Sequence, residues 1–265
     1  MKEHNKLSIR PPVILVHGMW GDQNTLNEVG DVFIKQGYSV DSICLPGHRK
    51  ISEYTQQRKK QLGETSLQQF VDYLVGYIRQ LPVPPILVGH SLGGLLVQLA
   101  AVRIPCEKLI LLSSAAPAGI VGLGISVFRT LGMNMLRFPL WKSVTELNLR
   151  RVQYGIANSQ SLATQQNIVE SATYESGRVT FQLTMASFLN KRSAAWVDSE
   201  KIRCPVLIIG GTEDRITPFR VQRSISQRFG NQATLVEIPG CCHWTIAGKY
   251  LPDVHRAILK WLAGY

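Results

Sequence analysis

Six short apolar runs recur along this 265-residue chain, and most are separated by amphipathic stretches long enough to form helices. Parallel strands need long, usually helical crossovers, and strands buried on both faces of such a sheet are almost wholly apolar. The sequence therefore predicts an α/β fold with a doubly wound, mostly parallel sheet. The predicted strands span residues 13–17, 39–45, 86–88, 108–113, 206–210 and 234–238, and clear helical stretches span 66–81 and 251–262.

The stretch from 115 to 200 interrupts this alternation. It has no clean strand pattern, yet its composition stays helical and apolar, above all between residues 119 and 141. A membrane span is the alternative for those residues, but Arg129, Asn134 and Arg137 break the run before it reaches the roughly 18 apolar residues of a span. We therefore predict no stable membrane insertion, an α/β core formed by residues 1–114 and 201–265, and an inserted helical cap formed by residues 115–200.

The formal net charge of +11 raises nucleic acids and acidic membrane surfaces as partners. The basic residues are scattered, however. Their densest short runs, 58–60 and 150–151, carry neither interleaved aromatic residues nor a known nucleic-acid-binding motif. We therefore expect a solvated basic surface and no nucleic-acid partner.

The cysteines and histidines indicate where the protein is located and whether it binds a metal. The five cysteines are an odd number without framework spacing, and the first twelve residues contain no apolar run of the signal-peptide kind. These features predict a cytoplasmic protein. The six histidines show no metal-ligand spacing, so no metal site is expected.

The stretch LVGHSLGGLL, residues 87–96, places Ser91 between Gly89 and Gly93. An apolar strand precedes the serine and a helix is predicted from residue 95 to 102, so Ser91 lies on a strand-to-helix turn. Such a turn strains the serine backbone and leaves no room for side chains on both flanking positions. The helix amino end also favours the negative charge that develops when a carbonyl is attacked. This context predicts a nucleophilic serine.

A serine nucleophile needs a base, and the base needs an orienting acid. Asp214 follows the apolar run 206–211 in a loop, with Glu213 as a neighbouring rival, and His243 lies in the loop before the last helix. In open α/β sheets such loops at the carboxyl ends of strands carry the chemistry. The order serine, acid, histidine is that of serine hydrolases built on this kind of sheet.

Four motifs together resemble the α/β-hydrolase superfamily, of the capped type that includes small esterases, lipase-like enzymes and carbon–carbon bond hydrolases: VILVHGMWGD, VGHSLGG, GGTEDRITP and PGCCHW. The resemblance covers nearly the whole chain. It implies that Ser91 is the nucleophile, Asp214 the acid and His243 the general base. It also implies an oxyanion hole formed by the backbone N–H groups of Met19 and Leu92, and a reaction that requires no metal or organic cofactor.

The sequence departs from relatives in two places. The second strand is often followed by D-x-P-G-H-G-x-S, whereas here Cys44 replaces the aspartate and Arg49 and Lys50 replace the Gly-x pair. The region before Val13 is also too short for the additional hairpin that many relatives carry. We therefore expect about six strands, with one short edge strand at most.

Serine at the turn excludes relatives that need a carboxylate nucleophile, and favours an esterase acting on small or medium hydrophobic carboxylic esters through an acyl-enzyme. Thioester hydrolysis, carbon–carbon cleavage, acyl transfer and non-catalytic ligand binding stay open as alternatives. His17 and His90 are expected to hold the catalytic loops by hydrogen bonds, and Cys242 to be a buried apolar residue. Candidate substrate-binding residues flank the catalytic loops or lie in the predicted cap; they are Trp20, Met133, Met135, Leu136 and Trp244.

Overall fold

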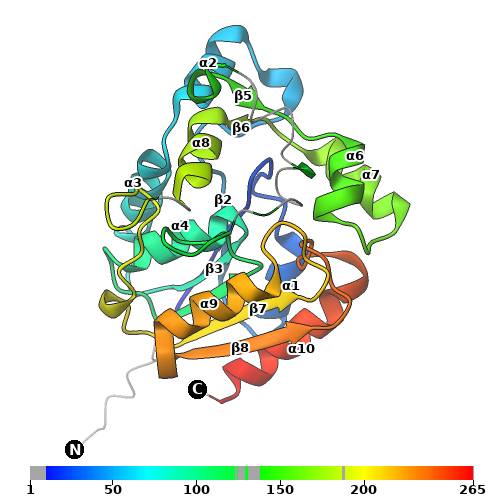
Figure 1. The fold of residues 1–265 in the computed structure, drawn as a ribbon. Helices are drawn as coiled ribbons and strands as arrows, with labels where there is room; N and C mark the ends of the chain where they lie inside the picture. The colour runs from blue at the N-terminus through cyan, green and yellow to red at the C-terminus, as the bar shows by residue number, and fades with distance from the viewer. Residues whose placement is uncertain (1–9, 123, 125–128, 131–137, 187–188, 265) are drawn as a thin grey trace, which may run out of the picture.

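A six-stranded sheet forms the centre of the molecule (Figure 1). The computed structural model describes residues 10–122, 124, 129–130, 138–186 and 189–264. All neighbouring strands of the sheet run parallel, in the order β2-β1-β3-β4-β7-β8. This confirms the predicted doubly wound sheet of about six strands. The strands are β1 (Val13–Val16), β2 (Val40–Ile43), β3 (Ile86–His90), β4 (Lys108–Leu112), β7 (Val206–Gly211) and β8 (Ala233–Ile238).

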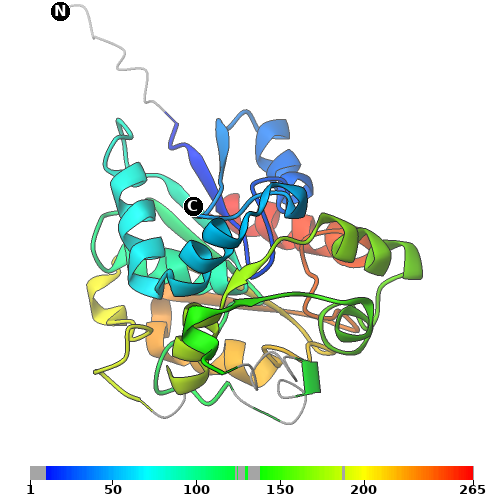
Figure 2. The same cartoon turned by 90° about the horizontal axis from the view of Figure 1, so that it is seen from above.

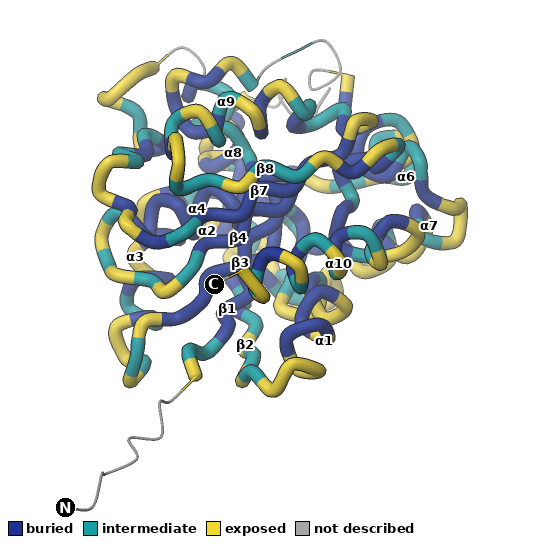
Figure 3. The backbone as a smooth tube through the Cα atoms, turned by 90° about the horizontal axis from the view of Figure 1, so that it is seen from below, coloured by how far each residue is buried: buried dark blue, intermediate teal, exposed yellow. Residues whose placement is uncertain are grey.

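Helices cover both faces of this sheet, because successive strand residues point to opposite sides. In β1, Val13 and Leu15 pack against α1 and α10, whereas Ile14 and Val16 face the core shared with α3, α4 and α9. The inner strands β1, β3, β4 and β7 are almost wholly buried between these layers, whereas the edge strands β2 and β8 are partly exposed (Figure 3). The covering helices are α1 (Asn27–Lys35), α3 (Leu67–Ile78), α4 (Leu92–Ala101), α9 (Phe219–Phe229) and α10 (Leu251–Leu262).

The helix limits differ from the predicted ones where the chain makes local hydrogen bonds. Helix α3 starts after Ser66, whose side chain forms a reciprocal capping box with Gln69. Helix α4 begins at Leu92 rather than residue 95, because the turn at Ser91 leads directly into it. Helix α10 has the predicted limits.

The chain between β4 and β7 packs beside α2 (Gln56–Glu64), at the top of Figure 1. It contains a strand pair that the sequence did not predict, since two-residue strands are too short to show a periodicity. Where the segment meets the rest of the chain, the Ala118 N–H donates to the Ala195 carbonyl oxygen over 2.9 Å. Its described elements are β5 (Val144–Thr145), β6 (Glu175–Ser176), α6 (Leu149–Arg151), α7 (Leu162–Ser171) and α8 (Gly177–Ala186).

Figure 2 shows this segment from above, across the ends of the strands. Three residues predicted to bind substrate, Met133, Met135 and Leu136, lie outside the described residues. The predicted division between the α/β core and the cap, at residues 114/115 and 200/201, stays a prediction. Within the described part of the chain, every helix is too short or too polar to cross a bilayer.

Candidate active site

Ser91 occupies a strained turn between β3 and α4. Its φ is 54° and its ψ −117°, a conformation that residues with side chains rarely adopt. A Cβ on Gly93 would lie 2.0 Å from the Val16 carbonyl oxygen, and one on Gly89 would lie 2.3 Å from that of Gly93. Only glycine fits at these two positions, which explains why the serine is flanked as it is.

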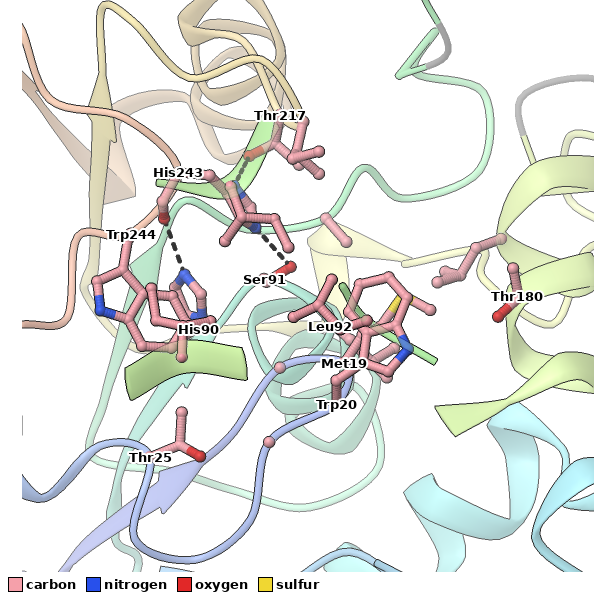
Figure 4. Close-up of a pocket in the computed structure, with 18 of the residues that line it drawn as sticks. Met19, Trp20, Thr25, His90, Ser91, Leu92, Thr180, Thr217, His243 and Trp244 are labelled. Atoms are coloured by element: carbon pink, nitrogen blue, oxygen red, sulfur yellow. Dashed lines mark hydrogen bonds between the residues drawn. The ribbon is translucent and has the colours of Figure 1, made fainter. Parts of the chain in front are cut away.

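Ser91 and His243 lie in hydrogen-bond contact (Figure 4). The His243 Nε2 atom is 2.9 Å from Ser91 Oγ, and its Nδ1 atom is 2.9 Å from Asp214 Oδ2. Since a carboxylate only accepts, Nδ1 carries the proton and donates to Asp214, which leaves Nε2 to accept the Ser91 hydroxyl proton. The structure thus brings together the three residues singled out in the sequence.

Asp214 is held by four donors. Its Oδ1 accepts the N–H groups of Ile216 and Thr217 over 2.8 and 2.7 Å, and its Oδ2 lies 2.9 Å from both the Thr217 hydroxyl and the His243 ring. Burial alone raises the pKa of this carboxyl, but the attraction of His243 and these hydrogen bonds outweigh burial and lower it. The rival Glu213 is exposed, whereas Asp214 is buried.

Met19 and Leu92 line the same pocket as Ser91. Leu92 is the first residue of α4, so its N–H has no acceptor within the helix. The loop before Met19 is fixed by buried His17, whose Nδ1–H donates to the Gly18 carbonyl oxygen over 2.8 Å. The Nε2 of His17 accepts the Leu45 N–H over 3.2 Å.

His90 supports the other half of the site. Its Nε2–H donates to the His243 carbonyl oxygen over 3.0 Å, which fixes the loop that carries the imidazole. Burial, and then repulsion by neighbouring histidines, lowers the pKa of His17 and of His90 to about 3. Both rings are therefore neutral and serve as hydrogen-bonding supports.

Comparison with known proteins identifies the family of the chain. Residues 13–247 match the model of the alpha/beta hydrolase family. The chain belongs to the α/β hydrolase family. Among curated relatives of this α/β hydrolase is the mouse (Mus musculus) protein named sn-1-specific diacylglycerol lipase ABHD11, which is 24% identical over 263 residues, covering 96% of this chain and 81% of that protein.

Solved structures share the fold of this α/β hydrolase. The monoacylglycerol lipase of Paleococcus ferrophilus has a TM-score of 0.68 at 22% identity, covering 96% of each chain. Methylketone synthase I of tomato, solved with 2-tridecanone, has a TM-score of 0.69 at 15% identity, covering 97% of this chain and 99% of that one.

The pocket above Ser91 in this α/β hydrolase is mainly apolar and encloses about 130 Å³. Trp20 and Trp244 both lie in its wall, and the Trp20 indole N–H donates to Thr145 of β5 over 3.2 Å. Thr180 of α8 closes the far side (Figure 4). The aliphatic part of the wall consists of Leu92, Leu147, Ile156, Ile168, Leu183 and Ile216.

Two residues could not be predicted from the sequence: one contacts the catalytic acid, and the other supports the site from further away. Thr217 lies in the quoted TEDRITP motif, yet nothing in the letters shows that its hydroxyl reaches Asp214. Glu175 pairs with His48 across 127 positions of the chain, a separation at which no local pattern links two residues. Within the described residues, no group of three or more histidine, cysteine or acidic side chains is arranged to hold a metal ion.

Proposed function

We propose that this protein is a serine hydrolase that cleaves carboxylic esters with a small to medium hydrophobic acyl group. The observation that carries the proposal is the unbroken hydrogen-bonded series from Ser91 through His243 to Asp214, with both bonds of the imidazole at 2.9 Å. A serine hydroxyl paired with a neutral, oriented imidazole is the arrangement that activates this weak nucleophile.

In the proposed reaction, Ser91 Oγ attacks the ester carbonyl while His243 Nε2 takes its proton. Asp214 stabilises the imidazolium that forms, and the proton then passes to the departing alcohol. The N–H groups of Met19 and Leu92 stabilise the tetrahedral oxyanion, each by roughly 3 kcal/mol. Water repeats the cycle on the acyl-enzyme and releases the acid.

The apolar pocket supports a hydrophobic acyl group. Four of its aliphatic wall residues, Leu147, Ile156, Ile168 and Leu183, come from the segment between β4 and β7, which we propose acts as the cap. An apolar cavity of roughly 150 Å³ holds a benzene molecule, so the 130 Å³ here suits an acyl chain of about six carbons. The lipase names of the mouse and Paleococcus relatives also support an ester of a fatty acid.

Turnover of nitrophenyl esters tests this function. Ser91→Ala is expected to abolish turnover and labelling by a fluorophosphonate without unfolding the protein, because it removes one oxygen and opens no cavity. Activity that survives in Ser91→Ala contradicts the serine mechanism. His243→Ala is expected to be about as severe, since residues that act as a unit are not additive.

An acyl-length series tests the substrate class. Specificity constants are expected to rise about fourfold per methylene, for about 0.8 kcal/mol each, from acetyl to hexanoyl esters and then to fall. Leu183→Trp fills the pocket wall and moves the maximum to shorter chains. Ile34→Trp is the matched control, because Ile34 is 58% exposed on α1. A flat profile in all three proteins contradicts the proposed acyl site.

A further inference from the structure

Two thiols meet where the inner strands β4 and β7 begin, at the end of the sheet opposite the candidate active site. Cys106 lies two residues before β4 and Cys204 two residues before β7, and their Sγ atoms are 3.2 Å apart. The two strands are neighbours in the sheet, and the Leu109 N–H donates to the Pro205 carbonyl oxygen over 3.0 Å just beyond the thiols. Hydrogen bonding therefore holds the two backbones in fixed register beside the pair.

The separation of the two sulfurs is short enough for a disulfide to form. Adjacent strands lie about 4.8 Å apart, and disulfides join Cα atoms about 4.4–6.8 Å apart with sulfurs at about 2.05 Å. Cys204 is a member of the buried core on the α3, α4 and α9 face, and Cys106 packs against that same core. Both side chains thus point to one side of the sheet, and an approach of about 1 Å brings the sulfurs to bonding distance.

We propose that Cys106 and Cys204 are a modification site, at which a peroxide converts the two thiols into a disulfide that fastens β4 to β7. The Cys204 thiolate attacks one oxygen of the peroxide, so that an S–O bond forms, the O–O bond breaks and the released hydroxide takes up a proton to become water. The Cys106 sulfur then attacks the sulfenic sulfur, an S–S bond forms, and the hydroxyl leaves with the Cys106 proton as a second water. Two thiols are oxidised by two electrons, and one hydrogen peroxide is reduced to two waters.

The surroundings set the order of these steps. Hydrogen bonding with Cys106 lowers the pKa of the Cys204 thiol and outweighs the opposing effect of its burial, which makes Cys204 the first sulfur oxidised. Cys106 is half-buried and therefore gives a small oxidant a route to the pair.

The crosslink closes a long loop of the chain. Its ends are 98 positions apart, and the loop contains β4 and the whole predicted cap but none of Ser91, Asp214 and His243. Closing a loop of this length restricts the unfolded chain, so oxidation is expected to raise Tm by roughly 5–15 °C. Ester turnover is expected to change by less than twofold, because the disulfide forms at the end of the sheet that lies opposite the candidate active site.

Peptide mapping tests the proposal directly. The full chain is treated with hydrogen peroxide, its remaining thiols are alkylated, and it is digested with trypsin without reduction. The two cysteines fall in separate peptides, 104–108 and 204–215, each with a single cysteine. We expect these peptides to be linked, the link to be lost with dithiothreitol, and the free thiols to fall from the five of the sequence by two.

Variants separate this pair from the other cysteines. Cys106→Ala and Cys204→Ala are expected to give no linked peptide and no oxidative rise in Tm, whereas Cys44→Ala, the matched control, keeps both. Wild-type protein whose two peptides stay unlinked after peroxide overturns the site, whether or not other cysteines react. A linked peptide without a rise in Tm overturns the stabilising role. Both readouts use the wild-type chain and depend on neither turnover nor the folding of a variant.

Discussion

The Nε2 atom of His48 lies 3.1 Å from a carboxylate oxygen of Glu175, and neither side chain is exposed to solvent. His48 belongs to the loop after β2 and Glu175 to β6, so the pair joins the sheet domain to the segment between β4 and β7. The other ring nitrogen of His48 is 3.3 Å from the Leu45 carbonyl oxygen. Both neighbours accept hydrogen bonds, so the imidazole of His48 is held from two sides and fixes the loop after β2 against β6.

Breaking this pair is expected to be costly. Glu175→Gln keeps the shape of the side chain but removes the carboxylate from this fully buried pair, and should lower the free energy of unfolding by about 3–5 kcal/mol. The double variant with His48→Gln should lose less than the two single changes together. Urea denaturation measures both. Asp253→Asn is the control, because its pair with Arg256 is largely exposed and contributes at most about 1 kcal/mol. A Glu175→Gln effect no larger than the control's contradicts the stabilising role of the buried pair.

Thr217 is expected to position Asp214 through its hydroxyl. That oxygen lies 2.9 Å from Asp214 Oδ2 and 3.0 Å from the Ser113 carbonyl oxygen. Thr217→Val has the same shape without the hydroxyl and should lower kcat for esters about tenfold, the effect of roughly 1.4 kcal/mol, with little change in KM. Thr217→Ser restores the oxygen and should retain most of the activity. Equal rates for the valine and serine variants contradict this role.

Gly93 and Gly76 form a matched pair for a test of the turn. Gly93→Ala pushes a Cβ to 2.0 Å from the Val16 carbonyl oxygen and should destabilise the protein by more than about 2 kcal/mol, with loss of turnover. Gly76→Ala, within α3, meets no atom within 4 Å and should stabilise by about 0.5–1 kcal/mol. Thermal unfolding followed by circular dichroism measures both variants. A neutral Gly93→Ala contradicts the tight approach of α4 to β1.

Acid is expected to destabilise the fold through His17 and His90, whose buried rings have pKa values lowered to about 3. In the unfolded chain both titrate near 6.5. Between these values the unfolded state binds more protons, so the free energy of unfolding falls as pH falls. The contribution is fully present above pH 6.5 and disappears through pH 3.

Urea denaturation across this pH range checks the slope. Each histidine adds up to about 1.4 kcal/mol per pH unit. His17→Asn removes one of the two titrating rings and should flatten the slope by that amount, while His255→Asn, at a partly exposed ring of α10, should change it less. Equal stability of the wild type at pH 7 and pH 4 contradicts the burial of neutral rings.

The parts of the fold that were predictable from the sequence are those fixed by short-range patterns. The turn at Ser91 could be predicted from two local features. Strand β3 is apolar because it is buried, and glycines flank the serine because the turn has no space for a Cβ. Asp214 and His243 could be identified because parallel strands all end at one edge of the sheet. The choice of Asp214 over Glu213 needed the backbone, which turns one side chain inward and leaves the other exposed.

Contacts between distant parts of the chain were beyond the sequence. The pairing of His48 with Glu175 depends on how the segment between β4 and β7 packs on the sheet. The meeting of Cys106 and Cys204 requires β4 and β7 to be neighbours, which the order of the strands along the chain does not state. Each of these relationships is set by tertiary structure alone.

The hydrogen bond between Ala118 and Ala195 gives the segment between them a common stem. The segment leaves and rejoins the sheet domain at neighbouring residues. Its own length or composition can therefore change without a shift of any strand of the sheet. On the proposed cap role, evolution can alter substrate range by exchanging residues within 119–194 as long as Glu175, the buried partner of His48, is kept, while selection on the reacting groups acts elsewhere. The same stem is the natural splice point for grafting the corresponding segment of another α/β hydrolase onto this sheet.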